Sequence, residues 1–323
     1  MSKATLAIIA AASAVSGAAA TAILYSAFPS RPSPSSAAPE PTLQSPESVS
    51  TPAPTRTSPV NPAGIFAYTT PGPFTSLSSH PSQISLVNFQ TRNPYWTAEH
   101  ITAASVFQNA ADRRYSSFAE DPSIPAKFRA RLSDYSRSGY DRGHQTPAAD
   151  AKWSQSAMDG TFFLSNMCPQ VGDGFNRDYW AHFEDFVRRL TGAYPSVRVI
   201  TGPLYLPRKD ERDGKWRVSY EVIGSPPNVA VPTHFYKIIY GEDKPGQDRN
   251  TVALGAFVLP NAPIDNGKPL TDFEVPVEAV ERASGLEFGA KLPNERRRRL
   301  CQEIECSLIV KHYAERQKSF QGR

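Results

Sequence analysis

The chain has 323 residues, of which 40% are apolar, so it is long enough for one large domain or two ordinary ones with a substantial core. Its formal net charge of +4 is compatible with a polyanionic partner such as a nucleic acid, although many soluble proteins are this basic. Three cysteines argue against the disulfide framework of a small secreted scaffold.

The first distinctive segment carries no charged residue from residue 4 to residue 30. Residues 4–28 are long enough to span a bilayer core of about 30 Å as a helix, although they are only moderately hydrophobic. We therefore expect residues 1–28 to be a hydrophobic targeting or anchor segment. A cleaved secretory signal and a mitochondrial transit peptide are less favoured, because only Lys3 precedes the run and Arg31 is the first arginine.

Residues 29–66 consist largely of proline, serine, threonine and alanine. Their apolar side chains are too sparse to offset the entropy lost on ordering, so we expect a disordered linker between the anchor and a folded domain. A propeptide that is later removed would have the same composition.

From residue 67 to residue 323 the pattern changes to that of a globular α+β domain. Alternating or continuous apolar runs predict strands at 84–89, 95–101, 161–166, 197–200, 218–223, 235–240 and 252–259. The first pair is expected to form a hairpin, and the last strand to be central because it is almost entirely apolar. Helices are predicted at 126–132, 175–190 and 274–284, with a terminal helix after Arg296–Arg299. This set predicts a central antiparallel sheet flanked by helices.

The cysteines are expected to be reduced thiols, with Cys168 buried near the functional site. Cys301 and Cys306 are spaced so that they could bridge, but an isolated pair without a CxxC partner is a poor zinc signal. We take the reduced state as the expectation for all three.

The segment Gly139–Gln145 concentrates an acid, a guanidinium, a glycine and an imidazole in Asp141, Arg142, Gly143 and His144. A core segment would not hold so many polar groups, whereas a functional site or a solvated loop could. Two asparagines and an acid follow at Asn166, Asn176 and Glu184. Together they suggest metal-assisted cleavage of a phosphodiester.

Such a reaction needs a base that activates water and a cation that neutralises charge on the phosphoryl oxygens. His144 suits the first role, because an imidazole can accept a proton near neutral pH. Asn176 suits the second, because one neutral amide oxygen leaves most of the coordination shell of Mg²⁺ to water. Gly143 is expected to let the backbone turn tightly beside the histidine.

The remaining residues are expected to support these two. Arg142 could clamp phosphate oxygens if the segment is bent, and would point away from His144 if it is extended. Glu184 is expected on the same helix as Asn176 and to act through water or an arginine. Asn166, at a strand end, could orient water or substrate, while Asp141 is assigned a structural ion pair by default.

Each residue also has an ordinary interpretation. A lone histidine beside an Asp-Arg pair is more often a surface hydrogen-bonding group, and Asn176 more often begins a helix than binds a metal. Glu184 alone is an ordinary helix-surface acid. The arginine run at 296–299 is more often a solvated helix face than a groove for nucleic acid. Only the joint order and spacing favour a site.

Several motifs resemble the DNA/RNA non-specific endonucleases of the ββα-metal (His-Me finger) class. They are Tyr140–His144, Leu164–Gln170, Phe175–Asn176 with Trp180 and Glu184, Thr201–Tyr205, Val231–Lys237, Phe257–Pro263, Val275–Glu278 and Glu281–Leu286. The resemblance covers residues 84–288, and its last groups look like the mitochondrial, endonuclease G type of branch.

The resemblance implies a ββα-metal fold with His144 as general base and Asn176 as the direct ligand of Mg²⁺, for which Mn²⁺ would substitute. It implies supporting roles for Arg142 and Glu184, and a site role for Asn166. A further phosphate-contacting arginine is matched to Arg114, with Arg113 as the competitor.

The resemblance also implies cleavage of both DNA and RNA, homodimers, and a mitochondrial location at the inner membrane or in the intermembrane space. Residues 4–28 would supply the membrane attachment. Two alternatives stay open at this stage. One is a catalytically inactive, membrane-tethered protein that binds nucleic acid, and the other is a secreted scavenging nuclease.

Overall fold

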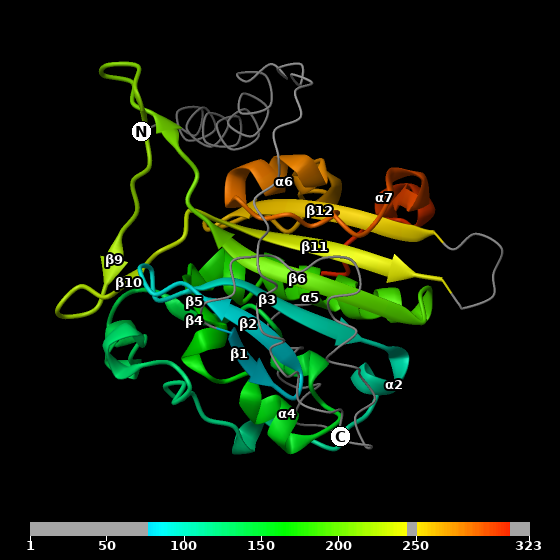
Figure 1. Ribbon diagram of the computed structural model, residues 1–323, viewed down its shortest axis with the longest axis horizontal. Helices are drawn as coiled ribbons and strands as arrows, with labels where there is room; N and C mark the ends of the chain where they lie inside the picture. The colour runs from blue at the N-terminus through cyan, green and yellow to red at the C-terminus, as the bar shows by residue number, and fades with distance from the viewer. Residues whose placement is uncertain (1–76, 244–250, 311–323) are drawn as a thin grey trace, which may run out of the picture. The chain divides into compact units, whose positions relative to one another are not determined.

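The computed structural model describes residues 77–243 and 251–310, which belong to one unit of the chain (Figure 1). The expected anchor (1–28), the expected linker (29–66) and the first residues of the expected domain lie outside the described residues. Within the described part, no helix has both the length and the apolar character needed to cross a membrane.

A seven-stranded sheet runs through the domain in the order β1-β2-β3-β6-β11-β12-β13. Its strands are β1 (Leu77–His80), β2 (Gln83–Val87), β3 (Pro94–Ile101), β6 (Ser196–Leu204), β11 (His234–Glu242), β12 (Val252–Pro260) and β13 (Arg297–Arg299). All neighbours are antiparallel except the short β12–β13 pair. The central antiparallel sheet and the β2–β3 hairpin are confirmed. The middle positions belong to β6 and β11, whereas β12 lies one strand from the edge.

Both faces of the sheet are apolar because helices cover both of them (Figure 1). On one face, alternate residues of β11 such as Phe235 and Ile239 pack with α5 (Tyr179–Arg189). On the other face, Tyr236, Ile238 and Tyr240 share a core with α6 (Val277–Ser284). The alternation follows from the two-residue period of a strand, which sends successive side chains to opposite faces.

The strand–strand–helix unit that the resemblance implies is present in full. It consists of β4 (Asp141–His144), β5 (Met167–Gln170) and α5, and the two strands form their own antiparallel pair outside the main sheet. The predicted helix at 274–284 is α6, and Gly285 ends it with a left-handed backbone at φ 72°.

Several short elements complete the described chain. The helical ones are α2 (Ala103–Val106), α3 (Leu132–Tyr135), α4 (Gln155–Gly160), α7 (Leu300–Glu303), and 3₁₀ turns at Arg113–Tyr115, Ala126–Phe128, Ala148–Asp150, Leu164–Asn166, Leu190–Gly192, Leu270–Phe273 and Asn294–Arg296. The short strands pair as β7 (Arg208–Lys209) with β8 (Trp216–Arg217), and β9 (Val222–Ile223) with β10 (Val229–Ala230).

Some predicted bounds are wrong. The strand expected at 161–166 is the 3₁₀ turn Leu164–Asn166, and β5 begins only after it. The strand expected at 218–223 is reduced to β9, and the helix expected at 126–132 is divided into a 3₁₀ turn and α3.

The helix predicted from Phe175 begins later, at Tyr179. Residues Gly172–Asn176 form a separate π-type turn, in which Gly174 has a φ of 75° that interrupts helical geometry. Glycine is also required there for space, because a Cβ at Gly174 would lie 2.7 Å from the Cβ of Pro263. Asn176 therefore precedes α5 and does not lie in its first turn.

The arginine run does not form the helix face that was its more ordinary interpretation. Its last three residues form β13, and each pairs with carboxylates. The nearest nitrogen–oxygen distances are 3.5 Å for Arg297–Glu278, 2.6 Å for Arg298–Asp243, 2.5 Å for Arg298–Glu303 and 2.8 Å for Arg299–Glu274. These charges are neutralised within the domain.

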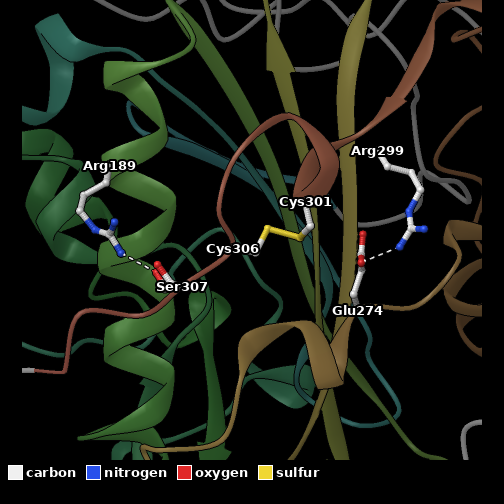
Figure 2. Close-up of a disulfide and its surroundings, with 6 residues drawn as sticks. All are labelled: Arg189, Glu274, Arg299, Cys301, Cys306 and Ser307. Carbon is white, nitrogen blue, oxygen red and sulfur yellow. Dashed lines mark hydrogen bonds and ion pairs between the residues drawn. A yellow bond between two sulfur atoms is a disulfide. The ribbon is translucent and has the colours of Figure 1, made fainter.

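The expectation of three free thiols is wrong for two of them. Cys301, on α7, and Cys306 form a disulfide (Figure 2). Cys168 is free and buried on β5 as expected. The bond closes the turn after α7 and holds the segment that follows. That segment is also held to α5, because the Arg189 guanidinium donates to the Ser307 carbonyl over 2.9 Å.

Candidate active site

The catalytic candidates of β4 lie along one strand in register with β5, Asp141 opposite Gln170 and His144 opposite Met167. Because residues two apart in a strand share a face, Arg142 and His144 point to the same side, and both contact Phe118. The expectation that an extended segment would turn Arg142 away from His144 is wrong for this reason.

His144 sits in an aromatic cradle and is only 8% exposed. Its ring centroid lies 5.6 Å from that of Phe118 and 4.9 Å from that of Phe162, which it meets edge to face. Burial, and then the nearby charge of Arg113, hold the pKa of His144 well below its ordinary value. The imidazole is therefore neutral, and so able to accept a proton, at physiological pH.

His144 makes no hydrogen bond with the described residues. Its Nε2 is buried and has no partner there. The imidazole is therefore not committed to another group of the described chain.

Two guanidinium groups flank the same cradle. The Arg142 carbon Cζ lies 4.3 Å from the centre of the Phe118 ring, and the Arg113 Cζ lies 5.4 Å from that of Phe162. Within the described residues, neither forms an ion pair with a carboxylate. Both positive charges therefore stay available to an anionic ligand beside His144.

Arg114, the residue first matched to the phosphate-contacting arginine, lies elsewhere. Its side chain is 74% exposed and forms an ion pair with Asp112, with 2.6 Å between Nη2 and Oδ2. The competitor, Arg113, is the one whose charge acts on both His144 and Glu184. The structure therefore favours Arg113 over Arg114 as the site arginine.

Asn176 is oriented by Asp141, the residue with no assigned chemical role beyond an ion pair. The Asn176 Nδ2 donates to Asp141 Oδ2 over 2.9 Å, and Arg177 pairs with the same carboxylate at 2.9 Å. This leaves the amide oxygen of Asn176 without a hydrogen-bond partner in the described chain. The expected ion pair of Asp141 is present, and its carboxylate also fixes which end of the amide faces out.

Glu184 is partly buried on α5 and is not an ordinary surface acid. Burial raises its pKa to about 7, while the positive charges of Lys237 and Arg188 oppose that rise. A carboxyl group with this pKa changes its charge in the physiological range. Its environment is therefore typical of a functional group.

Asn166 is fully buried, and backbone groups occupy its amide. It donates to the carbonyls of Thr146 and Thr161 over 2.9 and 2.8 Å, and it accepts from the Thr146 amide over 2.9 Å. These bonds hold the backbone two residues after His144 against the end of α4. In this structure, the Asn166 side chain therefore fixes the backbone that follows β4.

Sequence reasoning missed a set of buried charged residues beneath β4, namely Glu99, Asp150 and Lys237. Lys237 was detectable, because it is the only charge in the apolar run 235–240 of a central strand. A buried charge requires a partner, so its position should have directed attention to acids elsewhere in the chain.

Comparisons with known proteins agree with this geometry. The family model of the DNA/RNA non-specific endonucleases matches residues 61–295. The mitochondrial nuclease of Saccharomyces cerevisiae is 57% identical over 256 residues, which cover 79% of this chain and 78% of that protein. Human mitochondrial endonuclease G is 45% identical over 224 residues, covering 69% and 72%.

A solved structure of an EndoG/EndoGI complex contains a chain that matches with a TM-score of 0.70 and 44% identity, covering 76% of this chain and 100% of that one. The chain belongs to the DNA/RNA non-specific endonuclease family. It is an endonuclease with the expected ββα-metal fold, and its relatives confirm the expected mitochondrial location. Both earlier alternatives, the inactive tethered scaffold and the secreted enzyme, are thereby disfavoured.

Replacing Gly143 with alanine is expected to destabilise the site. A Cβ at this position would lie 2.0 Å from the Oε1 and 2.5 Å from the Cγ of Gln170, a fully buried residue of the neighbouring strand β5. The requirement is thus close approach between strands and not a tight turn. Overpacking of this kind costs roughly 1–3 kcal/mol of unfolding free energy, measurable by urea denaturation.

Gly192→Ala is the matched control, because a Cβ there meets nothing within 4 Å. Adding Gln170→Ala to Gly143→Ala should recover part of the loss. Equal stability of the Gly143 and Gly192 variants would contradict the steric explanation.

Proposed function

We propose that this endonuclease hydrolyses phosphodiester bonds in both DNA and RNA, with His144 as general base and one divalent cation held by Asn176. The observation that carries the proposal is a buried, neutral imidazole that packs on Phe118 and Phe162, the same two rings that hold Arg142 and Arg113, neither of which pairs with a carboxylate of the described chain. Such a site presents a base and positive charge together, as attack on a phosphate requires.

The donor set fits a hard, strongly hydrated cation. Asn176 offers one amide oxygen, and the described residues contain no group of three or more His, Cys, Asp or Glu side chains that could enclose a metal. Mg²⁺ commonly retains several waters, and Mn²⁺ should substitute for it. When bound, the ion would neutralise charge on the phosphoryl oxygens and stabilise the leaving oxygen.

The side chains of the protein supply proton transfer, phosphate binding and positioning. His144 takes a proton from the attacking water, and the aromatic cradle restrains the ring. Arg142 and Arg113 bind phosphate oxygens through their planar guanidinium groups. Asp141 holds the amide of Asn176, Asn166 holds the backbone after His144, and ionised Glu184 acts on Arg113 through its charge.

Substrate selection follows from the groups available. The site residues engage phosphate, which DNA and RNA share, and carry no sequence information by themselves. Binding dominated by phosphate contacts weakens steeply with added salt. We therefore propose cleavage with little base preference and without discrimination between the two sugars.

Two further proposals rest on the family resemblance alone. Residues 4–28 attach the protein to a membrane, which places it at the inner membrane or in the intermembrane space, and the enzyme works as a homodimer. Submitochondrial fractionation with N-terminal sequencing tests the first. Light scattering of the purified chain tests the second.

The central experiment is a plasmid-nicking assay with Mg²⁺. His144→Ala is expected to lower kcat/KM by about 10²–10⁴ through loss of the base, with DNA affinity in EDTA unchanged. Arg113→Ala should lose about 10²–10³. Arg114→Ala is the matched control and should cleave almost normally, because its charge is already paired with Asp112.

A His144→Ala protein that cleaves at the wild-type rate would overturn the base assignment. Equal losses in the two arginine variants would overturn the choice of Arg113.

Asp141→Ala should raise the Mg²⁺ concentration needed for half-maximal activity by about 10- to 100-fold, because the amide of Asn176 loses its orienting partner. Asn176→Ala should do more, abolishing direct binding. Titration of activity against metal concentration measures both. An Asp141→Ala enzyme with an unchanged metal requirement would remove Asp141 from this role.

The pH profile should report Glu184. Its pKa is raised to about 7, so the ionised form is lost as pH falls through 7, and activity should decline there. His144 does not set this limb, because its pKa lies well below its ordinary value. The Glu184→Gln enzyme should have lower activity at every pH, and its activity should no longer decline as the pH falls through 7. Persistence of the limb would assign it to another group.

A further inference from the structure

Lys237 is a charged residue in the middle of β11 with only 1% of its surface exposed. It lies on the sheet face that packs against α5, between Phe235 and Ile239 of the same face. Moving an ammonium out of water costs free energy that only close partners can offset. A lysine in this position therefore needs explanation.

The contacts of its ammonium lead directly to the catalytic strand. Nζ donates to the Thr201 hydroxyl over 2.9 Å and to the backbone carbonyl of Gln145 over 3.4 Å, and it lies 4.7 Å from the centre of a Trp180 ring. Gln145 directly follows His144. One buried cation thus holds the end of β4 against the central sheet.

Residues of the neighbouring strands β6 and β3 extend this connection between the sheet and the segment after β4. Lys237 and Thr201 are paired across β11 and β6, and Thr201 and Thr97 across β6 and β3. The Thr97 hydroxyl accepts from that of Thr146 over 3.3 Å, one residue beyond Gln145. A polar row therefore crosses this face of the sheet directly under the backbone that follows His144.

The charges facing Lys237 come from three other elements. They are Glu99 on β3, Asp150 in its 3₁₀ turn, and Glu184 and Arg188 on α5. Burial, and then the neighbouring Asp150, raise the pKa of Glu99 well above its ordinary range, which disfavours its charged form. Asp150 is paired with Arg188, with 2.9 Å between Oδ1 and Nη1.

Glu184 is the remaining acid of this cluster. Burial raises its pKa, and Lys237 is the strongest of the charges that oppose the rise; Arg188 and Arg113 act in the same direction and Asp150 against it. Arg188 is already held by Asp150, so Lys237 is the cation most free to stabilise charged Glu184. Nζ of Lys237 lies against the ring of Trp180, and Glu184 lies one turn further along the same side of α5. The ammonium therefore acts by its charge on the supporting acid and by a hydrogen bond on the strand of the base.

We propose that Lys237 is a positioning residue of the active site, whose buried ammonium holds the strand of His144 through the Gln145 carbonyl and keeps Glu184 charged from beneath. The catalytic part of this statement rests on the proposed function of His144 and Glu184. The electrostatic part does not, and can be measured without turnover.

Three substitutions separate the roles of the ammonium. Lys237→Met removes the charge and the donor, Lys237→Gln removes the charge but keeps a donor, and Thr201→Val keeps the charge but removes one hydrogen-bond partner. Lys215→Gln, which removes a charge from an exposed side chain, is the matched control for net charge. Circular dichroism and urea denaturation establish that each variant is folded.

The first measurement is kcat/KM for plasmid DNA against pH with Mg²⁺. Both Lys237 variants should move the acid limb upward by about 1–2 pH units, since loss of a nearby opposite charge raises the pKa of a carboxyl group. Their kcat should fall more than their KM rises. Thr201→Val and Lys215→Gln should leave the limb in place.

The second measurement is the ¹³C chemical shift of the Glu184 carboxyl group against pH, which needs no activity. Its midpoint should rise by the same amount in Lys237→Gln. A midpoint that does not move overturns the proposal, as does a limb that moves equally in Thr201→Val. A third outcome is also informative. If the titration midpoint of Glu184 rises as expected but the activity profile has no acid limb near pH 7, the electrostatic effect of Lys237 stands and the proposed role of Glu184 in activity is refuted.

Discussion

The hydrogen bond from the Asn176 amide to the Asp141 carboxylate is the constraint on which the site depends. It joins the first residue of the catalytic strand to the turn that precedes α5, and these are the two parts of the strand–strand–helix unit that must stay aligned. It also decides which end of a nearly symmetrical amide faces outward. A carboxylate placed there directly could bind a cation more strongly, but it would add negative charge beside a polyanionic substrate. Here the Asp141 carboxylate instead lies behind the neutral amide of Asn176 and orients it, so that the group facing outward carries no negative charge.

The charged groups of the site have different partners according to how deeply each group is buried. At its outer side, the guanidinium groups of Arg113 and Arg142 rest on aromatic rings and form no ion pair with a carboxylate of the described chain. Beneath it, acids and cations compensate one another in the dry space between α5 and the sheet. The imidazole lies at the boundary between them. Burial therefore keeps the imidazole neutral and lowers its basicity.

The sequence was sufficient for much of this architecture, because periodicity reports burial directly. The hairpin of β2 and β3 and the strands β6, β11 and β12 were recognisable for that reason. The spacing of His144 and Asn176 predicted a candidate site, and the structure places both residues in one strand–strand–helix unit. Features that depend on backbone torsion angles or on contacts between residues distant in sequence could not be predicted from the sequence. Whether Arg113 or Arg114 faces His144 depends on a 3₁₀ turn, in which adjacent side chains point a third of a turn apart. The late start of α5 depends on the left-handed backbone of Gly174, where a Cβ would also clash with Pro263, a residue distant in sequence.

The bond between Cys301 and Cys306 has a consequence of a different kind. Thiol pairs oxidise in oxidising compartments and persist as thiols where glutathione and thioredoxin reduce them. Since Cys168 is shielded inside the domain, this pair alone among the cysteines of the described chain can register its surroundings. The mass of the intact protein, lower by two hydrogens when the bridge is closed, is thus a chemical record of the environment in which the chain matured.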